Sequence, residues 1–103
     1  MKGQAPAGVE LWALLFTDYP IHAATEVKIV WRMTGRGDLA LRALGPQDQQ
    51  LRPEWGPEPH TGSNWNRPGG EWGSGFIFPA SGCWTVLASR GPDSGVTNLL
   101  VID

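Results

Sequence analysis

Cysteine is almost absent from the chain, and this limits its chemistry. The 103 residues include one cysteine, Cys83, together with two histidines, His22 and His60, and two methionines. A single thiol excludes an internal disulfide and every metal site built from several cysteines. A blue-copper site is disfavoured as well, because neither histidine nor methionine follows Cys83. A zinc site using both histidines and a carboxylate stays open, but the sequence predicts neither a metal nor a cofactor.

The chain also lacks an excess of positive charge. Eight lysines and arginines stand against ten aspartates and glutamates, which gives a net charge of −2. Proteins that bind nucleic acids use a surplus of lysine and arginine to hold the phosphate backbone. We therefore expect no nucleic-acid partner.

Long hydrophobic runs are missing. The longest strongly apolar stretch is Leu11–Phe16, whereas a transmembrane helix needs about twenty residues. We expect no membrane insertion by this segment. Residues 1–8 contain no apolar run of a secretory leader and are predicted to be a flexible linker. Because such linkers often follow an export signal or anchor, an extracytoplasmic location is expected, secreted or anchored through a removed N-terminal segment; the alternative is a cytosolic protein.

Helical patterns are missing too, and strand patterns take their place. Fourteen glycines and nine prolines interrupt every window that has a helical period. Short segments with period-two alternation of apolar and polar residues predict β-strands instead. The predicted strands cover residues 9–16, 27–33, 39–43, 72–78, 83–89 and 96–102. Strand 96–102 is expected at a sheet edge, where it would pair two copies of the chain into a homodimer.

Residues 45–70 form a long segment rich in proline, glycine and tryptophan. Residues 49–52 around Leu51 are predicted to be a short edge strand, and the rest is predicted to be loop. Trp55, Trp65 and Trp72 lie in or beside this segment. Three large apolar side chains argue against disorder, because burying an indole is strongly favourable.

One local pattern points to a fold family. A strand ending at Phe76–Phe78 is followed by Pro79, a tight turn at Gly82, and Trp84 at the start of the next strand. This pattern resembles the corner of bacterial extracytoplasmic immunoglobulin-like domains, with Trp84 where tyrosine is usual. The replacement removes the hydroxyl that makes the usual corner hydrogen bond. The resemblance implies an all-β, antiparallel immunoglobulin-like sandwich of about seven strands, in a single domain over residues 9–103.

Catalytic patterns are weak. Cys83 and His60 would be a thiolate pair if they met, but the start of a strand favours a small buried cysteine. Glu54, Glu58 and Glu71 flank tryptophans, an arrangement found in glycoside hydrolases. A chain this short leaves little depth for a sugar-binding groove, so these acids are interpreted as solubilising the loop. We expect no enzyme.

The remaining candidate site is aromatic. Flat indole faces combine with imidazole, amide and guanidinium donors in a set that suits either a sugar ring or a protein partner. Its members are Trp55, His60, Asn64, Trp65, Arg67 and Trp72. Trp12, Trp31 and Trp84 are predicted to lie in the core. For Trp55 and Trp65 the alternative is that they plug an open end of the core.

The sequence therefore predicts a non-catalytic extracytoplasmic immunoglobulin-like module that mediates protein–protein interaction or adhesion. The alternative is a small carbohydrate-binding module that uses the tryptophans of the loop. The identity of the protein or glycan partner does not follow from the sequence.

Overall fold

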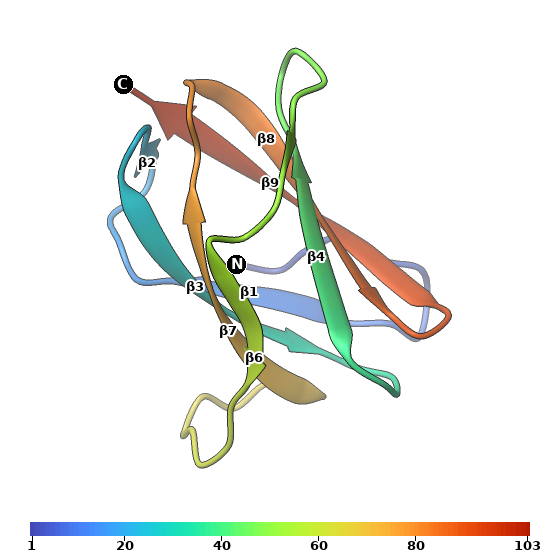
Figure 1. Ribbon diagram of the computed structural model, residues 1–103. Helices are drawn as coiled ribbons and strands as arrows, with labels where there is room; N and C mark the ends of the chain where they lie inside the picture. The colour runs from blue at the N-terminus through green and yellow to red at the C-terminus, as the bar shows by residue number, and fades with distance from the viewer.

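The computed structural model describes residues 1–103 and contains strands and no helix (Figure 1). Buried and exposed residues alternate along most of these strands. The nine strands are β1 (Leu11–Leu15), β2 (Ile21–His22), β3 (Glu26–Met33), β4 (Leu39–Leu44), β5 (Gln50–Leu51), β6 (Trp55–Pro59), β7 (Gly70–Ile77), β8 (Gly82–Arg90) and β9 (Asp93–Ile102). The prediction of an all-β chain is confirmed. With no helix present, none is long and apolar enough to cross a membrane.

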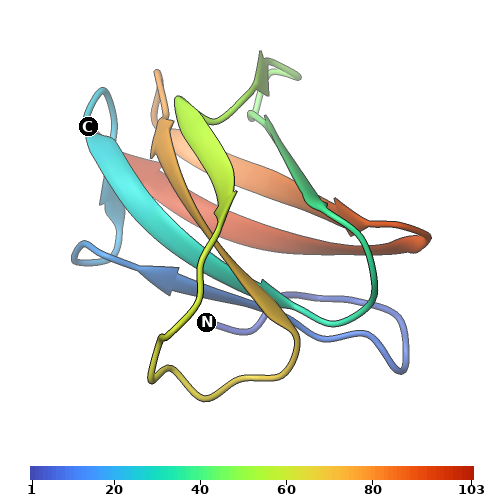
Figure 2. The same ribbon diagram turned by 60° about the horizontal axis from the view of Figure 1, so that its bottom comes forward.

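The strands form two sheets that face each other across a common core (Figure 2). The four-stranded sheet has the order β1-β3-β7-β6, and the five-stranded sheet has the order β2-β9-β8-β4-β5. Neighbouring strands are antiparallel, except that β2 and β9 are parallel. The short edge strand predicted at residues 49–52 is confirmed as β5. Strand β6 lies within the segment that was predicted to be loop.

Alternation decides which side chains enter the core. Val27, Ile29, Trp31 and Met33 of β3 are buried, as the sequence predicts. The facing sheet contributes alternating residues of β4 and β8, while Phe76 and Phe78 stack with their ring centroids 5.4 Å apart. The Trp31 indole N–H donates to Ser74 Oγ at 2.8 Å, and that hydroxyl donates to the Ile29 carbonyl at 2.9 Å. A buried indole is thereby satisfied without water.

The corner between β7 and β8 keeps a hydrogen bond. Trp84 is fully buried, and its indole N–H donates to the Ala80 carbonyl at 2.9 Å. The chain turns at Gly82 with φ near 127°, a conformation that L side chains rarely adopt. The ring nitrogen of this tryptophan therefore bonds the start of β8 back to the turn that precedes it.

Three expectations about β1, β8 and β9 are wrong. Trp12 is half-buried on the outer face of β1, because Leu11 and Ala13 take the inward positions. Cys83 is exposed, because it alternates with the inward Trp84. The residues 96–102 do not lie at a sheet edge, because β9 lies between β2 and β8.

The segment 1–8, predicted to be flexible, hydrogen-bonds to both sheets. The Gly3 N–H donates to the Leu11 carbonyl of β1 at 2.8 Å, and Gln4 exchanges two backbone hydrogen bonds with Val96 of β9. Lys2 Nζ lies 5.6 Å from the Trp12 ring centroid, which explains part of the cover over that indole. This segment therefore connects the edge strand β1 of one sheet to β9 of the other.

Candidate functional site

The outer face of the four-stranded sheet carries a strip without side chains. Gly73 and Gly75 are two successive outward residues of β7, between Glu71 and Ile77, and the Trp55 indole from β6 lies over them. A Cβ added at Gly75 would overlap the indole, whereas one at Gly73 would stand 3.4 Å from Trp55 Cζ3. The two glycines therefore form a seat in which the indole lies flat against the backbone.

The packing of the Trp55 indole on Gly75 leads to a testable prediction. We expect Gly75→Ala to displace the Trp55 indole, because the added methyl occupies the position of its pyrrole edge. The variant should lose about 1–3 kcal/mol of unfolding free energy, the usual cost of overpacking. The Trp55 indole N–H resonance in a ¹H–¹⁵N spectrum should move toward that of a solvated tryptophan.

Gly73→Ala is the matched control for that experiment. It adds the same methyl to the same strand and the same face, but at ordinary contact distance from the indole. Both changes restrict the unfolded backbone equally. Equal shifts of the Trp55 resonance in the two variants would contradict the proposed seat.

A buried ion pair holds the connection between β6 and β7 over this face. Arg32 Nε donates to Glu71 Oε1 at 2.9 Å, and the Glu71 side chain is 3% exposed. Arg32 Nη1 also donates to the carbonyls of Arg67 at 2.7 Å and Gly69 at 3.1 Å. His60 Nδ1 lies 2.5 Å from the other carboxylate oxygen, Glu71 Oε2. One carboxylate thereby connects β3, β7 and both ends of the loop 60–69.

Burial and hydrogen bonding act in opposite directions on the Glu71 carboxyl. Burial raises its pKa, while hydrogen bonds from His60, Arg32 and Ser63 and the charge of Arg32 lower it. The net effect is a pKa below the ordinary value of 4.5. The charged form is therefore the one that the folded protein stabilises.

The lowered pKa predicts how stability depends on pH. Because the folded protein binds the Glu71 proton less tightly than the unfolded chain does, the stabilisation is fully present above pH 4.5. It should disappear as the pH falls from 4.5 through the lower pKa of the folded state. Chemical unfolding of the wild type and Glu71→Gln over this range checks the prediction. A difference in free energy that stays constant with pH would contradict it.

The loop, β1 and β3 enclose a small cleft of about 230 Å³ on this face. Its apolar wall consists of outward side chains from two strands and two indoles: Leu14, Phe16, Val30, Trp55 and Trp65. Its polar groups are Lys28, Glu58, His60, Ser63 and Glu71. Phe16 is 56% exposed and Leu14 is 38% exposed, so the wall continues into an open apolar rim.

The structure brings together half of the six side chains named from the sequence. Trp55, His60 and Trp65 line the cleft. Both indoles are half-buried on the outer face of the sheet and are not part of the core, so the interpretation that they plug an end of the core is wrong.

The other three residues lie elsewhere. Asn64 is exposed on the loop outside the cleft lining. The guanidinium carbon of Arg67 lies 4.2 Å from the Trp12 ring centroid. Trp72 is buried on the inward face of β7. The guanidinium carbon of Arg90 lies 4.6 Å from the centroid of its ring.

The cleft contains residues that the sequence analysis did not single out. Leu14 and Lys28 come from β1 and β3 and Phe16 directly follows β1, so all three are far from the loop in sequence. Lys28 Nζ lies 4.8 Å from the Phe16 ring centroid, a distance at which the cation is attracted to the ring. A signal was present, because Leu14 and Phe16 are apolar at the outward positions of a strand.

The chemical groups considered for catalysis are dispersed. Cys83 and His60 lie on the outer sides of different sheets, so they do not form a pair. Glu71 is occupied by Arg32 and His60, while Glu54 and Glu58 are exposed. No group of three or more histidine, cysteine, aspartate or glutamate side chains is placed to hold a metal ion.

The arrangement therefore offers contact surfaces: a seated indole, a second indole, an apolar rim and a few hydrogen-bonding groups. No protein-family model matches the chain, and none of the curated proteins matches it.

Proposed function

We propose that the chain is a non-catalytic immunoglobulin-like module that binds a protein partner outside the cytoplasm. The strand order supports the fold part of this proposal. The order β1-β3-β7-β6 corresponds to strands A-B-E-D of an immunoglobulin domain, and β9-β8-β4 corresponds to G-F-C. The Trp84 bond to Ala80 stands where the tyrosine corner of that fold makes its bond. The extracytoplasmic location rests on the resemblance of residues 76–86 to exported domains.

The observation that carries the binding proposal is the open apolar rim of the cleft. Phe16 and Leu14 are exposed beside two half-buried indoles, which concentrates apolar surface on one face of a small protein. Such patches mark interaction sites, and aromatic residues dominate the binding energy of protein interfaces. The partner proposed here is a protein that places an apolar or aromatic side chain into the cleft. Lys28 and Glu58 at the cleft would orient it through hydrogen bonds.

A library of random displayed peptides, selected on the purified chain, tests this proposal. We expect selected peptides to be rich in apolar or aromatic anchors and to lose at least about tenfold in affinity with Phe16→Ser. Leu100→Ser is the matched control, because Leu100 is also exposed but lies on β9 of the other sheet. Peptides that bind wild type and Phe16→Ser equally would overturn the assignment of this face.

A carbohydrate ligand is the second candidate, and the seating of Trp55 favours it. One side of the indole rests on the glycines of β7 while the residue also lines the cleft, as a stacking platform for a sugar ring would. Glu58, His60 and Ser63 offer acceptors and donors for hydroxyl groups.

A glycan array separates the two candidates. A sugar that stacks on Trp55 in the cleft should bind wild type, bind Trp55→Ala at least about tenfold more weakly, and bind Trp12→Ala normally. Trp12 is the control because it is also a half-buried indole but lies outside the cleft. Absence of binding to every glycan, together with selected peptides, would reject the carbohydrate.

A further inference from the structure

One edge of the five-stranded sheet leaves backbone groups without partners. Strand β4 pairs with β8 along its whole length, but β5 pairs only with Ala43 and Leu44. The Gly45 N–H donates to the Gln49 carbonyl at 2.8 Å, so Gly45 points toward the β5 side. Alternate residues of a strand point to the same side. The N–H and C=O groups of Leu41 and Leu39 therefore face that side too, beyond the end of β5.

No hydrogen bond within the molecule reaches these groups. Strand edges of this kind bind other strands, and native proteins usually protect them. The remaining edges here are protected. Segment 1–8 covers part of β1, prolines 57 and 59 lie in β6, and Gln4, Tyr19 and β2 cover β9. The stretch Leu39–Arg42 is the open one.

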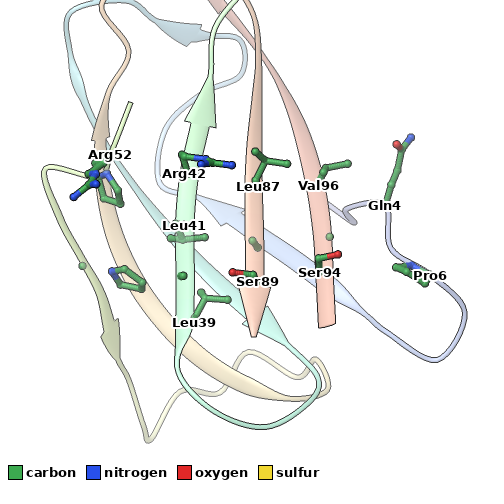
Figure 3. Close-up of a pocket in the computed structure, with 16 residues that line it drawn as sticks. Gln4, Pro6, Leu39, Leu41, Arg42, Arg52, Leu87, Ser89, Ser94 and Val96 are labelled. Atoms are coloured by element: carbon green, nitrogen blue, oxygen red, sulfur yellow. The ribbon is translucent and has the colours of Figure 1, made fainter. Parts of the chain in front are cut away.

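A wide hollow of about 970 Å³ borders this stretch (Figure 3). It extends from the segment 1–8 across β9 and β8 to β4, and ends at the connection from β5 to β6 and at Gly56 and Pro57 of β6. Leu39 and Leu41 line it although their side chains belong to the core, which is consistent with access to their backbone. Pro53 and Pro57 form the far wall and leave few competing donors there.

The charge of the hollow has one sign. Arg42 and Arg52 are its only charged lining residues, and both are exposed. Neither guanidinium makes a salt bridge or a hydrogen bond within the molecule. Arg42 lies directly on the open edge, so a carboxylate on a strand added beside β4 would come within its reach.

We propose that β4 accepts an extended acidic peptide segment as an additional strand. The backbone of the segment bonds to Leu39 and Leu41, and carboxylates on alternate residues pair with Arg42 and Arg52. This surface belongs to the five-stranded sheet and is separate from the cleft of the proposed function. The partner proposed here differs from that of the cleft. Its backbone pairs with β4, and its negatively charged side chains are selected by the two arginines.

The test uses the full chain and a synthetic, end-capped peptide of about eight alternating glutamates and valines. We expect the amide resonances of Leu39 and Leu41 to shift and their hydrogen exchange to slow when this peptide is added. A peptide of the same length with lysine in place of glutamate should not bind. The same acidic peptide with N-methyl groups on alternate residues should not bind either, because it cannot complete the ladder.

Arg42→Glu should weaken binding of the acidic peptide at least about tenfold by replacing attraction with repulsion. Arg36→Glu is the matched control, because Arg36 is exposed in the turn before β4 and lies outside the hollow. Three results would overturn the proposal: no shift at Leu39 and Leu41, equal binding of the lysine peptide, or equal loss in both arginine variants. Amide shifts confined to the cleft near Trp65 would also overturn this proposal, and would leave the proposed function of the cleft unaffected.

Discussion

Trp84→Ala is expected to destabilise the protein by about 3–5 kcal/mol, which would unfold much of the population of a domain with ordinary stability. The indole is fully buried and packs against Phe78 with ring centroids 5.4 Å apart. Truncation leaves a cavity between the sheets and leaves the Ala80 carbonyl without its donor. Denaturant unfolding monitored by circular dichroism measures the loss.

Trp84→Phe separates packing from hydrogen bonding. Phenylalanine refills part of the cavity but has no N–H for Ala80, so we expect a smaller loss of about 1–3 kcal/mol. A Trp84→Ala variant that melts near the wild-type temperature would show that this residue does not close the corner. Equal losses in the two variants would assign the whole effect to the hydrogen bond.

Glu71→Ala is expected to cost about 2–4 kcal/mol, because it leaves Arg32 without its carboxylate in a mostly buried site. The Arg32 side chain is 19% exposed, so water compensates only part of the loss. The loop 60–69 should also loosen, because His60 loses its partner as well. Unfolding free energy at neutral pH and proteolysis within the loop report the two effects.

Replacing both partners is the control for that prediction. The double variant Arg32→Met/Glu71→Leu buries no unpaired charge, so it should be more stable than Glu71→Ala alone. It should still lose the order of the loop, because the methionine cannot bond to the carbonyls of Arg67 and Gly69. A double variant as unstable as the sum of both single changes would show that the pair does not act as a unit.

Alternation predicted the core of β3, β4 and β8 because most of the large apolar side chains of these strands share one face, with Val30, Leu44 and Leu87 as the outward exceptions. It failed for β1, where Leu11, Trp12 and Leu14 place apolar residues on both faces. Period-two patterns give relative faces but do not say which face is inward. Strand β6 was missed because Gly56, Pro57 and Pro59 are typical of loops, although proline is tolerated in an edge strand.

The candidate site depends on pairings that no local pattern reveals. Arg32 and Glu71 are 39 residues apart and meet only because β3 and β7 align them as partners. The composition of the loop was enough to identify its tryptophans as candidate site residues. It did not indicate which residues of the sheet lie beneath them. Trp72 was placed in the site from composition, but it shares the inward face of β7 with Phe76 and therefore lies apart from the cleft.

The strip of outward glycines in β7 has a consequence for evolution of the protein. Glycine is poorly suited to a strand, and each one leaves the backbone freer before folding. Side chains added at Gly73 and Gly75 would raise the intrinsic strand preference of β7. At Gly75, however, the added Cβ would displace the Trp55 indole. At Gly75 glycine is therefore the residue that both the packing of the strand and the aromatic platform require, and its poor strand preference is the cost of seating the indole.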